Sequence, residues 1–179
     1  MSIIGKPFGL TTTTSSDHII EGSAVFDGDS GELTDNFSTA SDSYTKQTVS
    51  IWLKSAYETS DESMLFHTNV DGNNYSAIGL SDTSGDSHFF LSSYISGVGF
   101  NITATPDFVD PSAWYNLVVS FDSSVATPSS SSIRMWVNGV LQTAFNTETY
   151  PAQNHALWFS HPSYVTRIGS RAVSYTHLR

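Results

Sequence analysis

The sequence predicts an all-β protein, a two-sheet antiparallel β-sandwich of the jelly-roll type. Residues 114–121 and 133–137 alternate apolar and polar side chains, which is typical of strands with one buried face. Asn138 and Gly139 follow the second segment, and this pair suits the positive φ angles of a type I′ hairpin turn. No segment of the 179 residues carries a sustained 3.6-residue apolar period, so we expect little helix.

Other short segments of the same character recur along the chain, and turns rich in Asp, Asn and Gly separate them. Strands are expected at 23–26, 48–54, 63–67, 75–81, 87–93, 99–103, 156–159 and 165–170, with turns at 71–74 and 82–86. Val49, Ile51 and Leu53 share one face of their strand and are predicted to point into the core. Many short strands joined by polar loops favour two packed sheets over any other layer arrangement.

The chain is interpreted as one domain with an extension at each end. Residues 1–20 are rich in Thr and Ser and are expected to form an arm or linker, while 21–172 form the jelly-roll domain. Residues 173–179 (VSYTHLR) resemble translated sequencing-adapter read-through and are interpreted as a non-native tail. On that interpretation the fold lacks its last strand, and the strand at 165–170 is left with an uncovered edge.

Composition excludes several kinds of partner and site. The net charge is −10, with only seven Lys and Arg, so we expect no nucleic-acid partner. There is no cysteine, which excludes disulfides and zinc sites built on thiolates. No run approaches the ~20 apolar residues of a membrane span, so no membrane insertion is expected. The first residues lack the pattern of a signal peptide, which fits a virion protein released by lysis.

Several short motifs occur in a characteristic order along the chain. They are AVFDG at 24–28, the strand at 49–54, AWY and the strand it opens at 113–122, MWVNG at 135–139 and RIG at 167–169. In this order they resemble the laminin G-like jelly rolls of the concanavalin A-like lectin/glucanase superfamily. Residues 110–170 are most similar to modules of structural and tail-associated proteins of marine tailed phages, which share DPSAWY and a segment like TYPAQN at 149–154. The final strand usual in such modules is absent here.

The resemblance implies binding rather than chemistry, because family members engage glycans or proteins through a sheet face or its rim loops, some of them with calcium. It therefore predicts a non-enzymatic module of a phage virion, located in a tail or appendage, that recognises cell-surface carbohydrate. Several copies in one particle, as a homo-oligomer, would gain avidity from weak contacts. Two alternatives stay open. One is a purely structural module that contacts other virion proteins, and the other is a fragment of an extracellular bacterial adhesin or glycoside hydrolase.

The sequence contains no recognisable catalytic pattern. A retaining glycosidase needs two carboxylates about 5 Å apart, and in the superfamily that the chain resembles they lie on a strand with the pattern Glu-x-Asp-x-x-Glu. Here the glutamates are isolated, at Glu21, Glu32, Glu58, Glu62 and Glu148. His155 and His161 lack a metal-ligand spacing and are interpreted as ordinary surface or turn histidines. We expect no enzymatic activity.

Aromatic side chains are the candidates for sugar binding, because a ring face can stack on the apolar face of a pyranose. Trp52 and Trp136 lie opposite the core-facing residues of their strands, whereas Tyr75 and Trp158 lie near loops. These four residues are the predicted carbohydrate-binding set. Tryptophans in strands also pack commonly under loops or against a neighbouring strand, and that structural role stays open for each of them.

Calcium is the one cofactor that the sequence suggests. Ca²⁺ binds six to eight oxygen ligands from carboxylates, amides and carbonyls. Asp71, Asn73, Asp82 and Asp86 flank one expected hairpin and are predicted to converge at one rim of the sandwich. The simpler interpretation is that such residues form turns by hydrogen bonding to their own backbone.

Overall fold

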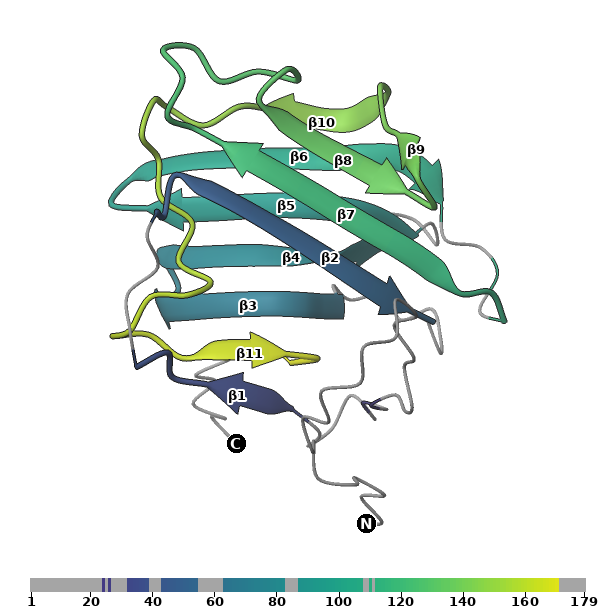
Figure 1. The fold of residues 1–179 in the computed structure, drawn as a ribbon, viewed down its shortest axis with the longest axis horizontal. Helices are drawn as coiled ribbons and strands as arrows, with labels where there is room; N and C mark the ends of the chain where they lie inside the picture. Colours follow the sequence, from purple (N-terminus) through teal and green to yellow (C-terminus); the bar gives the residue numbers. More distant parts are fainter. Residues whose placement is uncertain are drawn as a thin grey trace, which may run out of the picture.

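The computed structural model describes residues 24, 26, 32–38, 43–54, 63–82, 87–107, 110 and 112–170. Within these residues, two antiparallel sheets of seven and four strands pack face to face, with the four-stranded sheet in front in Figure 1. The predicted all-β sandwich is therefore confirmed. The described part of the chain has no helix of the length and apolar character needed to cross a membrane.

Each sheet is built largely from strands that are neighbours along the chain. The seven-stranded sheet has the order β1 (Leu33–Asp35), β11 (Thr166–Ile168), β3 (Ser63–Asp71), β4 (Asn74–Asp82), β5 (Ser87–Ile95), β6 (Val98–Asp107) and β10 (Phe145–Thr149). The four-stranded sheet has the order β2 (Lys46–Leu53), β7 (Tyr115–Asp122), β8 (Ile133–Val137) and β9 (Val140–Leu141). Both orders keep hairpin partners adjacent, so most of the pairing is local.

The core lies between the inner faces of the two sheets. Its fully buried members include Ile78, Leu91, Ile102, Leu117, Phe121 and Met135. The predicted inward positions Val49, Ile51 and Leu53 of β2 pack against this core and alternate with exposed residues. Alternation with a period of two thus identifies the buried face of the four-stranded sheet correctly.

The predicted hairpin turn at Asn138 and Gly139 is confirmed. Their φ angles are 50° and 77°, the left-handed values that a type I′ turn requires. The Asn138 amide donates to the Asn116 carbonyl, and the Asn116 amide donates back to Asn138 Oδ1, both at 2.8 Å. These bonds attach the turn to β7.

The prediction of a strand at 156–159 is wrong, because this segment forms a loop across one end of the sandwich. Its side chains alternate in burial as in a strand, and Leu157 and Phe159 reach the core. The backbone, however, is held by single contacts: the Leu157 amide donates to the Tyr44 carbonyl at 2.8 Å, and Gln47 Nε2 donates to the Leu157 carbonyl at 3.1 Å. The loop therefore closes the core without joining a ladder.

The last described strand does not have the uncovered edge that the sequence predicted. β11 lies between β1 and β3, with Leu33 opposite Ile168 and Thr166 opposite Thr68. A bond of 2.8 Å joins the buried Thr68 and Thr166 hydroxyls. Neither β1 nor β10 was expected, and of the strand expected at 23–26 only Ala24 and Phe26 are described, both outside strands. The predicted arm at 1–20 and tail at 173–179 lie outside the described residues.

Candidate functional site

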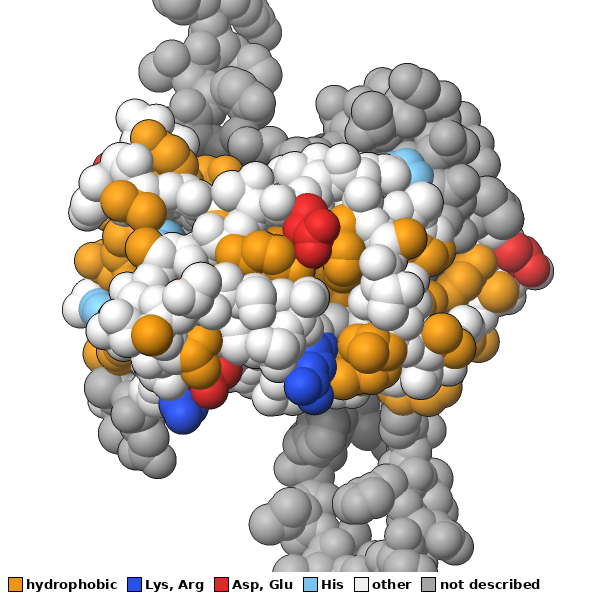
Figure 2. Space-filling model, turned by 90° about the horizontal axis from the view of Figure 1, so that it is seen from above, with side chains coloured by type: hydrophobic (Ala, Val, Ile, Leu, Met, Phe, Trp, Pro, Cys, Tyr) orange, Lys and Arg blue, Asp and Glu red, His pale blue; other side chains and the backbone are white. Residues whose placement is uncertain are grey.

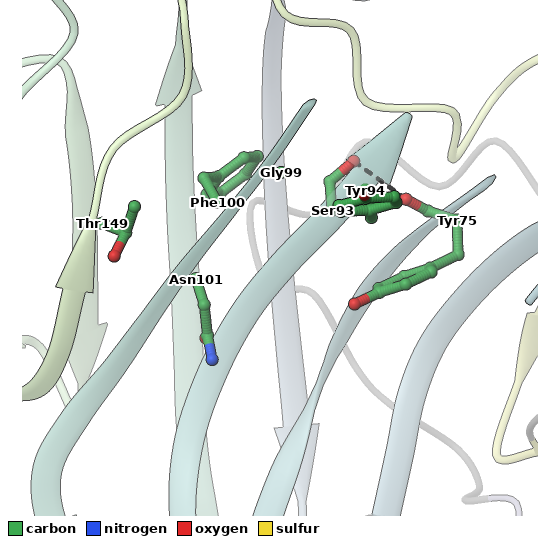
Figure 3. A pocket seen from close by; sticks show the side chains of 7 residues that line it. All are labelled: Tyr75, Ser93, Tyr94, Gly99, Phe100, Asn101 and Thr149. Carbon is green, nitrogen blue, oxygen red and sulfur yellow. Dashed lines mark hydrogen bonds between the residues drawn. The ribbon is translucent and has the colours of Figure 1, made fainter. Parts of the chain in front are cut away.

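A shallow, open depression of about 350 Å³ lies on the outer face of the seven-stranded sheet, away from the core (Figure 3). Its lining residues are Tyr75, Ser93, Tyr94, Gly99, Phe100, Asn101 and Thr149. They come from β4, β5, β6 and β10, so the depression crosses four strands at one end of the sheet. We call it the tyrosine depression.

A glycine makes room for the first of its rings. Tyr94 and Gly99 are opposite each other in the β5–β6 pair, and a Cβ at Gly99 would lie 2.5 Å from Tyr94 Cδ2. The Tyr94 ring therefore occupies the space above the Gly99 backbone. The same arrangement recurs beside the depression, where Phe90 covers Gly79. Each ring shields backbone that glycine would leave bare.

The second ring belongs to Tyr75, which is half-buried beside a small apolar cluster. Met64, Ala77 and Phe90 form this cluster on the outer face, and Tyr75 packs against it. The Tyr75 hydroxyl lies 3.3 Å from Ser92 Oγ. These contacts hold the ring in one position before any ligand arrives.

Polar groups complete the lining. Asn101 and Thr149 are opposite each other in the β6–β10 pair, and both are exposed. The Thr103 hydroxyl donates to Asn101 Oδ1 at 3.2 Å, which leaves the amide hydrogens of Asn101 free to donate to a ligand. In Figure 3 Asn101 and the Tyr75 ring point to the same side of the sheet and Phe100 to the other. No lining side chain is charged.

Beneath the depression a buried Ser–His pair ties the sheet to the loop at 150–164. His155 Nε2 lies 3.0 Å from Ser93 Oγ, and that hydroxyl donates to the Tyr75 carbonyl at 2.9 Å. Burial lowers the pKa of His155. His155 is not a surface residue, since it is 8% exposed, but it does end a turn, because its amide donates to the Ala152 carbonyl at 3.2 Å. With Ser93 1% exposed, the pair is closed to substrate and acts as a structural link rather than as a nucleophile and base.

The four predicted sugar-binding aromatics lie on three different surfaces. Tyr75 lies in the tyrosine depression, whereas Trp52 and Trp136 lie on the outer face of the four-stranded sheet. Trp158 lies in the loop at the end of the sandwich, where its ring centroid is 4.7 Å from Tyr164 and 6.2 Å from His161. These four residues therefore do not form one site.

Sequence reasoning missed Tyr94, Asn101 and Thr149. Tyr94 and Asn101 occupy outward positions of their strands, so strict alternation through 87–95 and 98–103 could have identified them. Thr149 could not be found in this way, because nothing in its neighbourhood predicts the pairing of β10 with β6.

The predicted calcium ligands do not converge. Asp71 and Asn73 lie at the β3–β4 turn, where Asp71 Oδ1 accepts from the Asn73 amide at 2.8 Å. Asp82 lies at the far end of the nine-residue β4, ~25 Å away at the usual rise of a strand. Asp86 lies outside the described residues. Among those that are described, no three His, Cys, Asp or Glu side chains gather as a metal site.

The two described glutamates interact with separate partners and do not form a pair of carboxylates. Glu32 accepts from the Ser170 hydroxyl and lies 3.4 Å from Arg167 Nε, while Glu148 accepts from the Tyr150 hydroxyl at 2.7 Å. These two glutamates belong to opposite edges of the seven-stranded sheet. Glu21, Glu58 and Glu62 lie outside the described residues. The pKa values of Asp110 and Asp122 are lowered, first by hydrogen bonds from Ser112 and Ser124 respectively.

Comparison with known proteins identifies one family. Residues 26–172 match a family model described as the concanavalin A-like lectin/glucanases superfamily, of the laminin G type. A comparison with curated proteins finds no match. The matched range includes both sheets and the whole of the tyrosine depression.

Proposed function

The chain belongs to the concanavalin A-like lectin/glucanase superfamily, and from this premise we propose that the tyrosine depression binds a neutral carbohydrate. The observation that carries the proposal is the composition of the lining. Two phenol rings, an amide and a threonine hydroxyl face solvent together, with no charged side chain among them. Rings can stack on the apolar face of a sugar, while the amide and hydroxyl exchange hydrogen bonds with its hydroxyl groups.

The shape of the depression favours a ligand held at the surface. It is shallow and open, so a terminal sugar or a short stretch of a polymer can lie across β4, β5 and β6 without entering the core. Such contacts are weak singly, and several copies on one particle would strengthen them through effective concentration. The phage-virion setting inferred from the motif resemblance is part of this proposal, with cell-surface glycan as the ligand and the virion as the location.

We further propose that binding takes place without chemistry. The described glutamates lie at opposite edges of one sheet, and the Ser–His pair is buried, with Ser93 1% and His155 8% exposed. The lining of the depression includes no carboxylate and no histidine, the groups that most often transfer protons in glycoside hydrolysis. A glycan bound there would leave unchanged.

The test is affinity electrophoresis in gels containing neutral polysaccharides such as dextran, mannan or laminarin. We expect one or more to retard the protein, and Tyr94→Ala to weaken that binding about three- to tenfold, the usual contribution of one aromatic contact. Tyr94→Phe keeps the ring and should bind like the wild type.

Val70→Ala is the matched control, because Val70 is exposed on β3 and does not line the depression. If no neutral polysaccharide retards the wild type, or if Tyr94→Ala and Val70→Ala migrate alike, the proposal fails. Total indifference to sugars would favour the structural-contact alternative.

A further inference from the structure

Three of the four described Lys and Arg residues lie on one sheet. The structure describes four Lys and Arg residues: Lys46, Lys54, Arg134 and Arg167. The first three lie in or directly after strands of the four-stranded sheet, at exposed positions that alternate with the core-facing ones. In Figure 2 the visible Lys and Arg side chains lie along one side of the molecule, beside hydrophobic side chains. Within the described part of the chain, the basic side chains are therefore unevenly distributed between the two sheets.

Strand register places two of these cations in line with two tryptophans. Arg134 is opposite Ser120, which is opposite Thr48, and one step along the outer face Trp136 is opposite Val118. Trp52 is opposite Asn116, a further step along. The outer face thus carries a diagonal row formed by Arg134, Trp136, Trp52 and Lys54, which we call the cationic stripe. The two strands that carry it, β2 and β8, lie on either side of β7 in Figure 1.

The two rings of the stripe are separated by the width of two strand spacings. Strands lie ~4.8 Å apart and rise ~3.3 Å per residue, which puts the Trp52 and Trp136 Cα atoms about 12 Å apart. Trp52 is 59% exposed, and Trp136 is half-buried opposite Leu141 of β9. Two ring faces at this separation can contact two non-adjacent sugars of one chain.

The basic side chains in and beside the stripe differ in whether they have an acidic partner. Lys46, beside the stripe, is paired with Asp122 at 3.3 Å. Lys54 lies close enough to Asp110 to interact with it electrostatically. Arg134 is exposed and makes no ion pair with any described residue. It is therefore the strongest candidate for an external anion, since guanidinium binds carboxylate and sulfate oxygens through two parallel hydrogen bonds.

We propose that the cationic stripe binds an acidic polysaccharide, a chain of sugar rings that carry carboxylate or sulfate groups. Such a polymer offers a ring to each tryptophan and an anion to Arg134 and Lys54. A protein partner fits less well, because the centres of protein interfaces are apolar and depleted in charge. On this face Val118 lies between the two rings, and Ser50, Asn116 and Ser120 around it supply hydroxyl and amide groups suited to a hydroxylated ligand.

The overall negative charge does not prevent this binding. At physiological ionic strength the Debye length is ~8 Å, so carboxylates on the far sheet are screened from a ligand on this face. The two described carboxylates near the stripe both have partners: Asp122 is paired with Lys46, and Asp110, which interacts with Lys54, accepts a hydrogen bond from Ser112. The ligand therefore meets the local charge rather than the net charge of the chain.

The proposal stands independently of the tyrosine depression, because the two sites lie on opposite outer faces of the sandwich. The test uses the full chain and three polymers: polygalacturonate for carboxylate, dextran sulfate for sulfate, and dextran as the neutral counterpart. Binding is measured by biolayer interferometry with the polymer immobilised. We expect the wild type to bind one or both acidic polymers through the stripe, with Arg134→Gln and Trp52→Ala each weakening the affinity about tenfold.

Arg167→Gln is the matched control, since it removes the same charge from the other sheet and should change the affinity less than twofold. Tyr94→Ala should also leave acidic polymer binding intact, which separates this proposal from that of neutral sugar binding. Polygalacturonate binding alone would identify carboxylate as the anion, and dextran sulfate binding alone would identify sulfate. Failure to bind either polymer, or equal losses in Arg134→Gln and Arg167→Gln, would overturn the proposal. So would self-association of the wild type that Trp52→Ala abolishes without any polymer binding.

Discussion

The two outer faces of the sandwich are built by the same alternation but present different chemistry. On the seven-stranded sheet, glycines let aromatic rings lie close to the backbone, and an uncharged tyrosine depression results. On the four-stranded sheet, tryptophans stand beside Lys and Arg on a face without a described depression. The difference shows that the outward positions, which the core leaves free to vary, decide the surface chemistry of each face.

A second contrast lies in what supports each face. Under the tyrosine depression, Ser93 is bonded to His155 of the end loop, so the sheet and the loop are coupled there. The cationic stripe stands over a purely apolar layer that includes Leu117, Val119 and Met135. We therefore expect the first face to respond to changes in the loop and the second to be largely indifferent to them.

Leu157→Ala should have the largest effect, because it removes a buried side chain that both sheets share. Leu157 is 1% exposed in the core, and such a truncation costs about 3 kcal/mol of unfolding free energy. Urea unfolding measures the loss, and Val140→Ala, at an exposed position of β9, should stay within about 0.5 kcal/mol of the wild type. Equal effects of the two variants would show that the end loop is not part of the core.

Gly99→Ala should separate the two faces. The new Cβ would lie 2.5 Å from the Tyr94 ring, so the ring must move, at a cost of about 1–3 kcal/mol in stability. Neutral-sugar binding should fall with it, while binding of acidic polymer should persist. Gly72→Ala is the control, because a Cβ there has nothing within 4 Å. Loss of both binding activities at a temperature where the variant is folded would contradict the separation.

The smallest expected effect is a pH dependence carried by His155. Burial lowers its pKa in the folded state below the unfolded value of ~6.5, so the unfolded chain binds more protons in the interval between them. Stability from this residue is thus complete above about pH 6.5 and declines as the pH falls towards the lowered pKa. Urea unfolding at pH 7.5 and 5.0 should show a smaller difference in His155→Gln than in the wild type. An unchanged difference would remove His155 as the cause.

The features that could be predicted from the sequence are the strands and turns that depend on residues close together in the chain. The strands β7 and β8 followed from alternation and the turn after β8 from Asn138 and Gly139, and these are confirmed; the pairing of β7 with β8 and the short β9 were not predicted. β10 was not predicted, because four of its five side chains are exposed at a sheet edge and the strand therefore has no apolar period to detect. At the segment around Leu157 a strand was predicted where none exists. Its side chains alternate in burial because they close the end of the core, not because its backbone pairs with another strand.

The candidate sites were harder to predict because they depend on register between distant strands. Tyr75 was identified as an aromatic near a turn, but its companions Asn101 and Thr149 meet it only through the β4–β5–β6–β10 order. Likewise, seven scattered Lys and Arg residues indicated no basic patch, yet pairing through β7 brings the outer face of β2 alongside that of β8. Sheet topology, rather than any local motif, assembles both faces.

The most direct test of two independent binding faces is NMR mapping of backbone amides in the 19.5 kDa chain, titrated separately with a neutral oligosaccharide and with an oligogalacturonate. The neutral ligand should shift the amides of Tyr94, Gly99 and Asn101, and the acidic ligand those of Trp52 and Arg134. Each ligand should shift its own set of amides to the same extent whether or not the other ligand is already bound. If both ligands shift the same set of amides, or if one displaces the other, the two faces do not act as separate sites.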